Sequence, residues 1–426
     1  MALKKYALSD VCTIVPGFAF KSNEFGSGEN IAVKIKDIEP PSVNIKNAER
    51  VCFTPQDKFR LSKGDYIMAM TGATIGKVGK LQIDAKNVYI NQRVCKFNPI
   101  TSVCDKEYLY YVLSAPSFRN FIYNNVDSKL AQPNIGHPTI YKYTHLFPTD
   151  IKEQKLIASV LNNINRKIEL NKQINDNLEA MAKQLYDYWF VQFDFPNEEG
   201  KPYKSSGGAM VWNDKLKREI PQRWHCGTLL DIAEYTNGLA CQKYRPTDNN
   251  KLPVIKIKEM HDGLSADTEW VKADIPDDVK VFDGDVLFSW SASLEVMLWA
   301  YGNGGLNQHI FKVTSKNGYP RSFYFYQLIH YVGVFKQIAE ARKTTMGHIT
   351  QDHLRQSTIA LPPNIDVANK LEEKLCPIFD AIVKNNQEIM ALTKQRDELL
   401  PLLMNGQASV NYHLSVYFFR AFSYII

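Results

Sequence analysis

The sequence lacks the features that mark secreted, membrane-spanning and zinc-binding proteins. Its 426 residues contain no run of about twenty uncharged apolar residues, and the N-terminal stretch MALKKYALSD has no apolar signal core. The seven cysteines lie far apart, with no C-x-x-C pair and no Cys/His set at zinc spacing. We therefore expect a cytoplasmic protein with reduced thiols and no metal site.

Motifs for catalysis on nucleic acids are missing as well. The sequence has no Asn-Pro-Pro-Tyr-like methyltransferase loop, no G-x-G-x-x-G behind a strand and no complete Walker sequence. The stretch TGATIGKVGK (residues 71–80) comes nearest, but only three residues separate Gly72 from Gly76, and Val78 stands where a Mg²⁺-binding hydroxyl belongs. Because the preceding GDYIMAM has strand-like apolar content, we predict a strand, a turn and a strand here, in a chain without catalysis.

The composition is that of an ordinary globular protein. With 45% hydrophobic residues, a chain of this length forms two or three domains, each with its own core. The net charge of +6 permits a polyanionic partner, although the basic residues are scattered rather than gathered in a tail.

The second half of the chain repeats the first. KIKDI (34–38) recurs as KIKEM (256–260), GDYIMAM (64–70) as GDVLFSW (284–290), and INQRVCKF (90–97) as LNQHIFKV (306–313). From Pro148 and Pro362 onward the two halves align without a gap. Each half therefore contains a mixed α/β module, with short strands bounded by Gly and Pro, followed by a long helix.

Apolar residues near a 3.5-residue period predict that the two long helices pack on each other in the manner of a coiled coil, and an antiparallel pairing would hold the two modules at opposite ends of a fixed spacer. Asn171 and Asn385 interrupt the two stripes at equivalent positions, either to meet and fix the register or to lie at a solvated edge. After the first helix, Trp189, Phe190 and Phe193 are expected to pack with Phe195 at the helix end or to dock a partner. The apolar residues of the two stripes include Ile164, Ile168, Leu178, Leu185, Ile378, Ile382, Leu392 and Leu399.

Two separated modules without catalytic motifs favour a protein that recognises two separated sites on one long polymer. DNA is the natural candidate, because each base pair presents a distinct donor and acceptor pattern in the major groove. An enzyme with a hidden active site and a scaffold that binds protein are the competing hypotheses.

The order of these elements resembles the specificity subunit of type I restriction-modification systems. The similar segments are LSKGDYIMAMTGATIGKVG, EQKLIASVLNNINRKIELNKQINDNLEAMAKQLYDYWF, FDFPNEEGKPYKSSGGAMVWNDKLKREIP and LLPLLMNGQASV, within residues 5–410. The resemblance implies an α+β fold in which two mixed α/β target recognition domains, in pseudo-two-fold arrangement, are separated by the two antiparallel helices.

The resemblance also implies a division of the chain and a set of partners. Each recognition domain reads one half of a gapped DNA target, and the helices set the gap and dock two methyltransferase subunits, which restriction/translocase subunits join. S-adenosylmethionine, ATP and Mg²⁺ belong to those partners, and this chain holds no cofactor. The expected parts are recognition domain 1 (1–150), spacer helix 1 (151–192), a linker (193–225), recognition domain 2 (226–362), spacer helix 2 (363–408) and an atypical aromatic tail (409–426).

Side-chain chemistry names candidates for DNA contact. Asn and Gln suit adenine and Arg suits guanine, although an Asn-Gln pair also starts a strand with satisfied turn hydrogen bonds. The lysines and threonines are candidates for phosphate or groove contacts. The candidates are Thr71, Thr74, Lys77, Asn91, Gln92, Arg93, Lys129, Asn307, Gln308, His309, Lys343 and Thr345.

Overall fold

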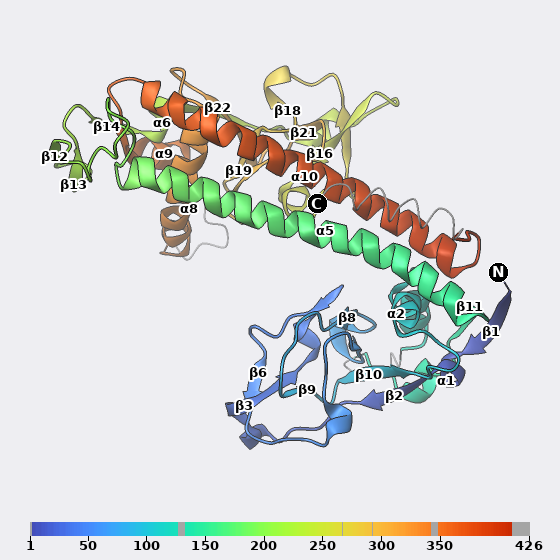
Figure 1. Cartoon of the computed structure of the whole chain (residues 1–426). Helices are drawn as coiled ribbons and strands as arrows, with labels where there is room; N and C mark the ends of the chain where they lie inside the picture. The colour runs from blue at the N-terminus through green and yellow to red at the C-terminus, as the bar shows by residue number, and fades with distance from the viewer. Residues whose placement is uncertain (1, 127–132, 266, 292, 342–347, 411–426) are drawn as a thin grey trace. The chain divides into compact units, whose positions relative to one another are not determined.

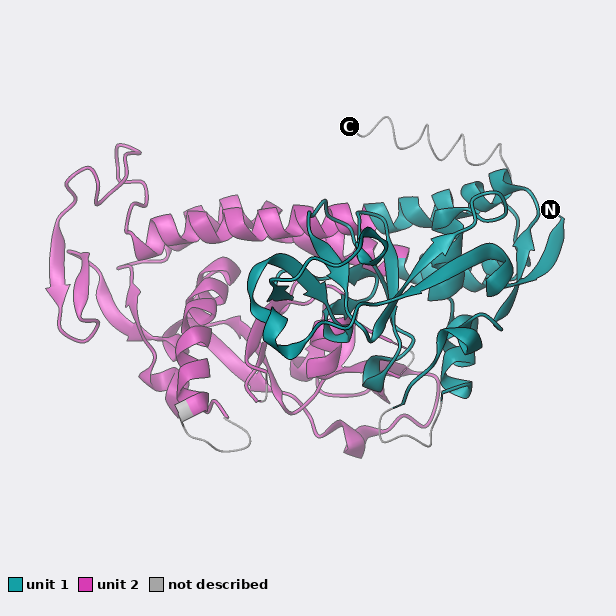
Figure 2. Cartoon of the chain, turned by 90° about the horizontal axis from the view of Figure 1, so that it is seen from below, with its two compact units in different colours: residues 1–166, 393–426 teal, residues 167–392 magenta. Residues whose placement is uncertain are grey.

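The fold repeats one pattern of strands and helices in two compact units, each of which includes part of two long helices (Figures 1 and 2). The structure is a computed structural model that describes residues 2–126, 133–265, 267–291, 293–341 and 348–410. Unit 1 consists of residues 1–166 and 393–426, and unit 2 of residues 167–392. No helix within the described residues is both long and apolar enough to span a membrane.

The module of unit 1 is built on two β-sheets that share one hydrophobic core, while its short helices pack in a second core against the larger sheet. A six-stranded sheet has the order β2-β10-β7-β8-β5-β4, and a three-stranded sheet has the order β6-β3-β9, with β3 and β9 parallel. The strands are β2 (Cys12–Pro16), β3 (Phe25–Val33), β4 (Ile38–Glu39), β5 (Ser42–Val43), β6 (Glu49–Val51), β7 (Tyr66–Ala69), β8 (Val78–Lys80), β9 (Val88–Ile90) and β10 (Val94–Pro99). The helices are α1 (Leu8–Val11), α2 (Lys106–Ser114), α3 (Pro116–Asn124) and α4 (His137–Ile140).

Unit 2 repeats this topology. A four-stranded sheet, β15-β22-β19-β20, corresponds to β2-β10-β7-β8, and the sheet β17-β16-β21-β18 again holds a parallel pair, β16 with β21. The strands are β15 (Ala233–Asn237), β16 (Lys251–Ile255), β17 (Trp270–Lys272), β18 (Lys280–Val281), β19 (Val286–Ser289), β20 (Glu295–Leu298), β21 (Gly304–Leu306) and β22 (Ile310–Ser315). The helices are α6 (Leu229–Ile232), α7 (Ile257–Asp262), α8 (Arg321–Ala341) and α9 (Gln351–Gln356). The repeat predicted from the sequence is thus confirmed as a repeat of structure.

Each module is closed by a two-stranded sheet directly before its long helix. In unit 1, β1 (Leu3–Ala7) pairs antiparallel with β11 (Thr144–Pro148), which leads into α5 (Ile151–Tyr186). In unit 2, β14 (His225–Thr228) pairs with β23 (Thr358–Leu361), which leads into α10 (Asp366–Met404). The start and the end of each module therefore meet at the base of a helix.

The segment after α5 is more ordered than a linker of Pro, Gly and Ser suggests. A π-helical turn (Asp187–Val191) extends α5, and a hairpin of β12 (Met210–Asn213) and β13 (Arg218–Pro221) follows. Trp189, Phe190, Phe193 and Phe195 are buried in the core of unit 2, where Trp224 contacts three of their rings. The expectation that these aromatics pack at the helix end is confirmed.

The helices α5 and α10 lie side by side and antiparallel (Figure 1). Asn171 Nδ2 donates to Glu388 Oε2 at 2.9 Å, and further along α5 Asn175 Nδ2 donates to Asn386 Oδ1 at 2.8 Å. Asn385 Nδ2 in turn donates to Asn175 Oδ1 at 2.9 Å. As the residue numbers rise along α5, those of their partners fall along α10, so the two helices run antiparallel.

The polar layer between these helices differs from the one expected. Asn171 and Asn385 do not hydrogen-bond each other, because Asn175, one helical turn beyond Asn171, takes that place and contacts both Asn385 and Asn386. Burial acts to raise the pKa of Glu388, but hydrogen bonds from Lys167 and Asn171 outweigh it and lower this pKa. Of the predicted stripe, Ile168 and Ile382 are buried, and Ile164, Leu178, Leu185, Ile378, Leu392 and Leu399 are half-buried.

Replacement of Asn175 with Ala is expected to lower the free energy of unfolding by about 1–3 kcal/mol, because the amides of Asn385 and Asn386 lose a partner in a poorly hydrated seam. Urea unfolding followed by circular dichroism measures the change. Asn177→Ala, at an exposed position of the same helix, is the matched control and should stay close to wild type. Equal effects of the two substitutions would show that the asparagine layer does not stabilise the helix pair.

Candidate nucleic-acid interface

Three strand ends meet at one edge of the main sheet in each unit. The end of β2 pairs with the start of β10 (Pro16 with Cys95), and the end of β7 pairs with the same start (Ala69 with Val94). Unit 2 has the same register, in which Asn237 of β15 pairs with Phe311 and Ser289 of β19 with Ile310. The edges consist of Met70, Thr71, Gln92, Arg93, Asn134 and Ile135 (edge 1) and of Trp290, Gln308, His309, His348 and Ile349 (edge 2).

A buried asparagine shapes the turn before β10 and before β22. The Asn91 side chain accepts a hydrogen bond from Gln92 N at 2.7 Å, and Asn307 accepts a long one from His309 N at 3.4 Å. Asn91 is 9% exposed and Asn307 is 6% exposed, so neither amide is presented to a ligand. Both asparagines, candidates for base contact in the sequence, therefore hold the turns, as the alternative interpretation has it.

Close backbone approach explains the glycine that faces each asparagine. A Cβ atom on Gly17 would lie 2.0 Å from the carbonyl oxygen of Asn91, and one on Gly238 would lie 2.3 Å from that of Asn307. These glycines allow the short parallel bridges of Phe18 with Asn91 and of Leu239 with Asn307. The two units thus share one backbone scaffold at their edges.

The side chains carried by this scaffold differ between the units. Gln92 and Arg93 are exposed at edge 1, whereas Gln308 and His309 are half-buried at edge 2. The backbone of each position is fixed, because Arg93 O accepts from Met70 N at 2.9 Å and His309 O from Trp290 N at 3.3 Å. Each edge thus combines a rigid backbone with polar side chains.

Edge 2 is aromatic where edge 1 is aliphatic. The ring of Trp290 lies 5.7 Å from that of His309 and 5.4 Å from that of His348, and its Nε1 donates to Asn237 Oδ1 at 3.0 Å. Met70 occupies the equivalent place at edge 1 and is only 8% exposed. The Nδ1 atom of His309 is shielded from solvent and has no hydrogen-bond partner among the described residues.

Residues 133–135 join edge 1, and residues 348–349 join edge 2. Gly72 N donates to Pro133 O and Ile135 N donates to Met70 O, each at 3.0 Å, and Ile349 N donates to Trp290 O at the same distance. Thr71 also bridges to Asn134. Three of the sequence candidates, Lys129, Lys343 and Thr345, lie outside the described residues.

The stretch TGATIGKVGK forms the connection from β7 to β8, as the predicted strand, turn and strand require. Gly72 and Gly76 have φ angles of 75° and 76°, which suit glycine. Thr71 and Thr74 have hydroxyl oxygens that are shielded from solvent and lack a hydrogen-bond partner within the described ranges, and Lys77 is half-buried.

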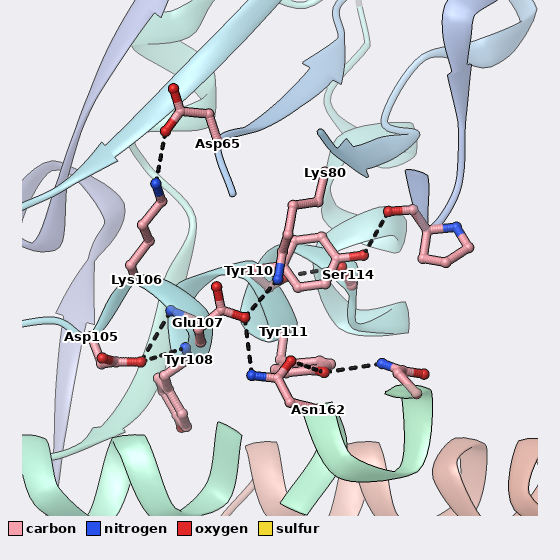
Figure 3. A network of polar contacts seen from close by, with 12 residues as sticks. Asp65, Lys80, Asp105, Lys106, Glu107, Tyr108, Tyr110, Tyr111, Ser114 and Asn162 are labelled. Carbon is pink, nitrogen blue, oxygen red and sulfur yellow. Dashed lines mark hydrogen bonds and ion pairs between the residues drawn. The ribbon is translucent and has the colours of Figure 1, made fainter. Parts of the chain in front are cut away.

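A polar network attaches the module of unit 1 to α5 (Figure 3). Lys80 Nζ lies 2.6 Å from Glu107 Oε2, which also accepts from Asn162 Nδ2 of α5 at 3.0 Å. Tyr111 OH donates to Asn162 Oδ1 at 2.7 Å and accepts from Asn165 Nδ2 at 3.0 Å. Lys80 is only 7% exposed, so its ammonium group depends on these partners.

The same network also contacts the loop between β4 and β5. Lys80 Nζ lies 4.1 Å from the centre of the Tyr110 ring, and Tyr110 OH donates to Pro41 O at 3.1 Å. Burial raises the pKa of Tyr110 to about 12, so the hydroxyl stays a neutral donor at physiological pH. The loop, α2 and α5 are therefore connected through Lys80 and its neighbours.

Unit 2 attaches its module to α10 with other residues at the equivalent place. Arg321 Nη2 of α8 lies 3.5 Å from Asp380 Oδ1, and Ser322 N donates to Glu372 Oε2 at 2.8 Å. Gln387 Nε2 donates to Asp283 Oδ2 at 2.8 Å. Each module is thus anchored to the long helix that follows it in the chain.

Glu107→Ala is expected to lower the free energy of unfolding by about 2–3 kcal/mol, because it leaves the buried Lys80 ammonium group without its carboxylate. The double variant with Lys80→Met should lose less than the sum of the two single changes, and a double-mutant cycle from urea unfolding measures the difference. Glu29→Ala, an exposed carboxylate of the same unit, is the control. Additive effects of the two substitutions would refute the coupling of Lys80 to Glu107.

Comparison with known proteins places the chain in a family. The model of the type I restriction modification DNA specificity domain matches residues 2–180 and again residues 221–395, once in each half of the chain. The chain therefore belongs to this family. Its members are DNA sequence-recognition subunits of type I restriction-modification systems and are themselves non-catalytic.

Individual relatives agree with this assignment. The chain is 26% identical over 315 residues to the type I restriction enzyme MjaIX specificity subunit of Methanocaldococcus jannaschii, which covers 71% of this chain and 69% of that protein. It is 21% identical over 416 residues to the HindI specificity subunit of Haemophilus influenzae, covering 83% and 88%. The crystal structure of a type I S subunit from M. genitalium has the same fold, with a TM-score of 0.59, 14% identity and coverage of 95% and 96%.

Proposed function

We propose that this chain directs a type I restriction-modification complex to a bipartite, gapped DNA target, in which each recognition domain reads one half-site. The duplicated edge carries the proposal. Asn91 and Asn307 hold the same turn in the two units, whereas Arg93 and His309 present different chemistry beside it. One scaffold with two sets of polar side chains, exposed at edge 1 and half-buried at edge 2, suits two half-sites of different sequence.

In this proposal the long helices set the gap between the half-sites. Both α5 and α10 contribute residues to both units, so the two modules share one helical pair. The asparagine layer fixes the register of that pair, and the anchors at Glu107 and Arg321 fix each module to its helix. A fixed helix length then corresponds to a fixed number of base pairs.

The catalytic activities belong to the proposed partners. Two methyltransferase subunits dock on the helices and use S-adenosylmethionine, and restriction/translocase subunits use ATP and Mg²⁺. The net charge of +6 favours approach to the DNA phosphates in the cytoplasm.

Co-expression with a methyltransferase subunit in a host that lacks type I enzymes tests the proposal. Sequencing that detects N6-methyladenine should find one gapped motif that is methylated only when this chain is present, because base contacts and not the methyltransferase select the site. The control is the same host with the methyltransferase subunit alone.

Two results would refute the proposed function. Methylation that does not change when the chain is deleted would show that the chain does not select the site. An ungapped motif would show that the two recognition domains do not read separate half-sites.

A further inference from the structure

The two edges keep one position rigid while its side chain changes. Position 93 and position 309 each come two residues after the buried asparagine that holds the turn. Each is followed by the first residue of a central strand, Val94 or Ile310, which is 0% exposed. The backbone at such a position moves little, and base discrimination needs a rigid point of attachment for the side chain.

A second backbone contact fixes the same position. The carbonyl oxygen of Arg93 accepts from Met70 N, and that of His309 accepts from Trp290 N. Met70 and Trp290 also accept from Ile135 N and Ile349 N, so each of them links position 93 or 309 to the segment around Ile135 or Ile349. The backbone geometry is thus the same in both units.

The chemistry at the position suits purines. An arginine guanidinium donates to O6 and N7 of guanine, and an imidazole N–H donates to a purine N7 in the major groove. His309 packs against the Trp290 ring, and its Nε2 lies 3.3 Å from Gln308 Nε2, an amide donor. Because Nδ1 of His309 is shielded from solvent, the imidazole donates to a base through Nε2, after Gln308 has turned away from it.

We propose that positions 93 and 309 are pseudo-equivalent specificity-determining positions, at which Arg93 reads a guanine in one half-site and His309 reads a purine in the other. The inference rests on the proposed function and adds which side chains distinguish the bases. At this position the two half-sites would differ because arginine in unit 1 is replaced by histidine in unit 2 on the same backbone.

The test maps the methylated motif of the complete complex with single variants. Arg93→Ala should relax one base pair of one half-site, with a loss of discrimination of roughly tenfold to a hundredfold, and leave the other half-site unchanged. Arg93→Lys should keep the guanine, because a lysine ammonium also donates to guanine acceptors. His309→Arg should introduce a guanine preference at one position of the other half-site.

Matched controls separate base reading from charge and folding. Arg50→Ala removes the same charge from β6, in the other sheet of unit 1, and His225→Ala removes an exposed imidazole from β14. Both controls should leave the motif unchanged. Thermal unfolding of every variant shows whether the chain is folded.

Each part of the proposal can be overturned by a different result. An unchanged motif in Arg93→Ala, or a uniform fall in methylation at all sites without a change of motif, would overturn the assignment of position 93. An unchanged motif in His309→Arg would overturn the equivalence of the two positions. A wild-type complex without a gapped motif would instead contradict the proposed function.

Discussion

The antiparallel pairing of α5 with α10 is the constraint on which the rest of the structure depends. Both helices run through both units, and each module begins and ends at the base of one of them. Apolar contacts along the pair tolerate sliding, whereas hydrogen bonds between asparagines do not. Asn175, with its two partners Asn385 and Asn386, therefore gives the pair one register.

The two units share their backbone geometry but differ in the side chains that it carries. The network of Lys80, Glu107 and Asn162 in unit 1 is replaced by Arg321 with Asp380 in unit 2. At the edges, Gly17 and Gly238 keep the same close approach while Met70 is replaced by Trp290. A scaffold that holds its backbone by glycine contacts and strand register leaves the side chains free to differ, as the proposed reading of two different half-sites would require.

Much of the fold follows from patterns that are local in the sequence. The repeat, the long helices and the strands around TGATIGKVGK depend on periodicity and on glycine, which the sequence displays directly. The partner of Asn171 does not follow, because a shift of one helical turn in the register exchanges Asn385 for Glu388, and only packing along the whole pair fixes that register. The hairpin of β12 and β13 within the expected linker was missed because the Pro, Gly and Ser residues of the preceding stretch 196–208 led the whole segment to be interpreted as a linker.

The candidate interface could be predicted only in part. The sequence singled out the segments NQR and NQH because they repeat, but it assigned Asn91 and Asn307 the same role as their neighbours. Burial separates them, since the asparagines shape the turn and the next residues are exposed or half-buried. Trp290 gave no signal in the sequence, because its place beside His309 arises from the pairing of β19 with β22, which are distant in the chain.

The most direct measurement is the gap in the methylated motif after the helices are lengthened. Seven residues inserted into α5, with seven at the facing place in α10, keep the apolar stripe in phase and add about 10 Å, the length of roughly three base pairs. If the helix pair is the ruler, both half-sites stay the same and the gap grows by about that number. An unchanged gap, or a change in either half-site, would contradict the account.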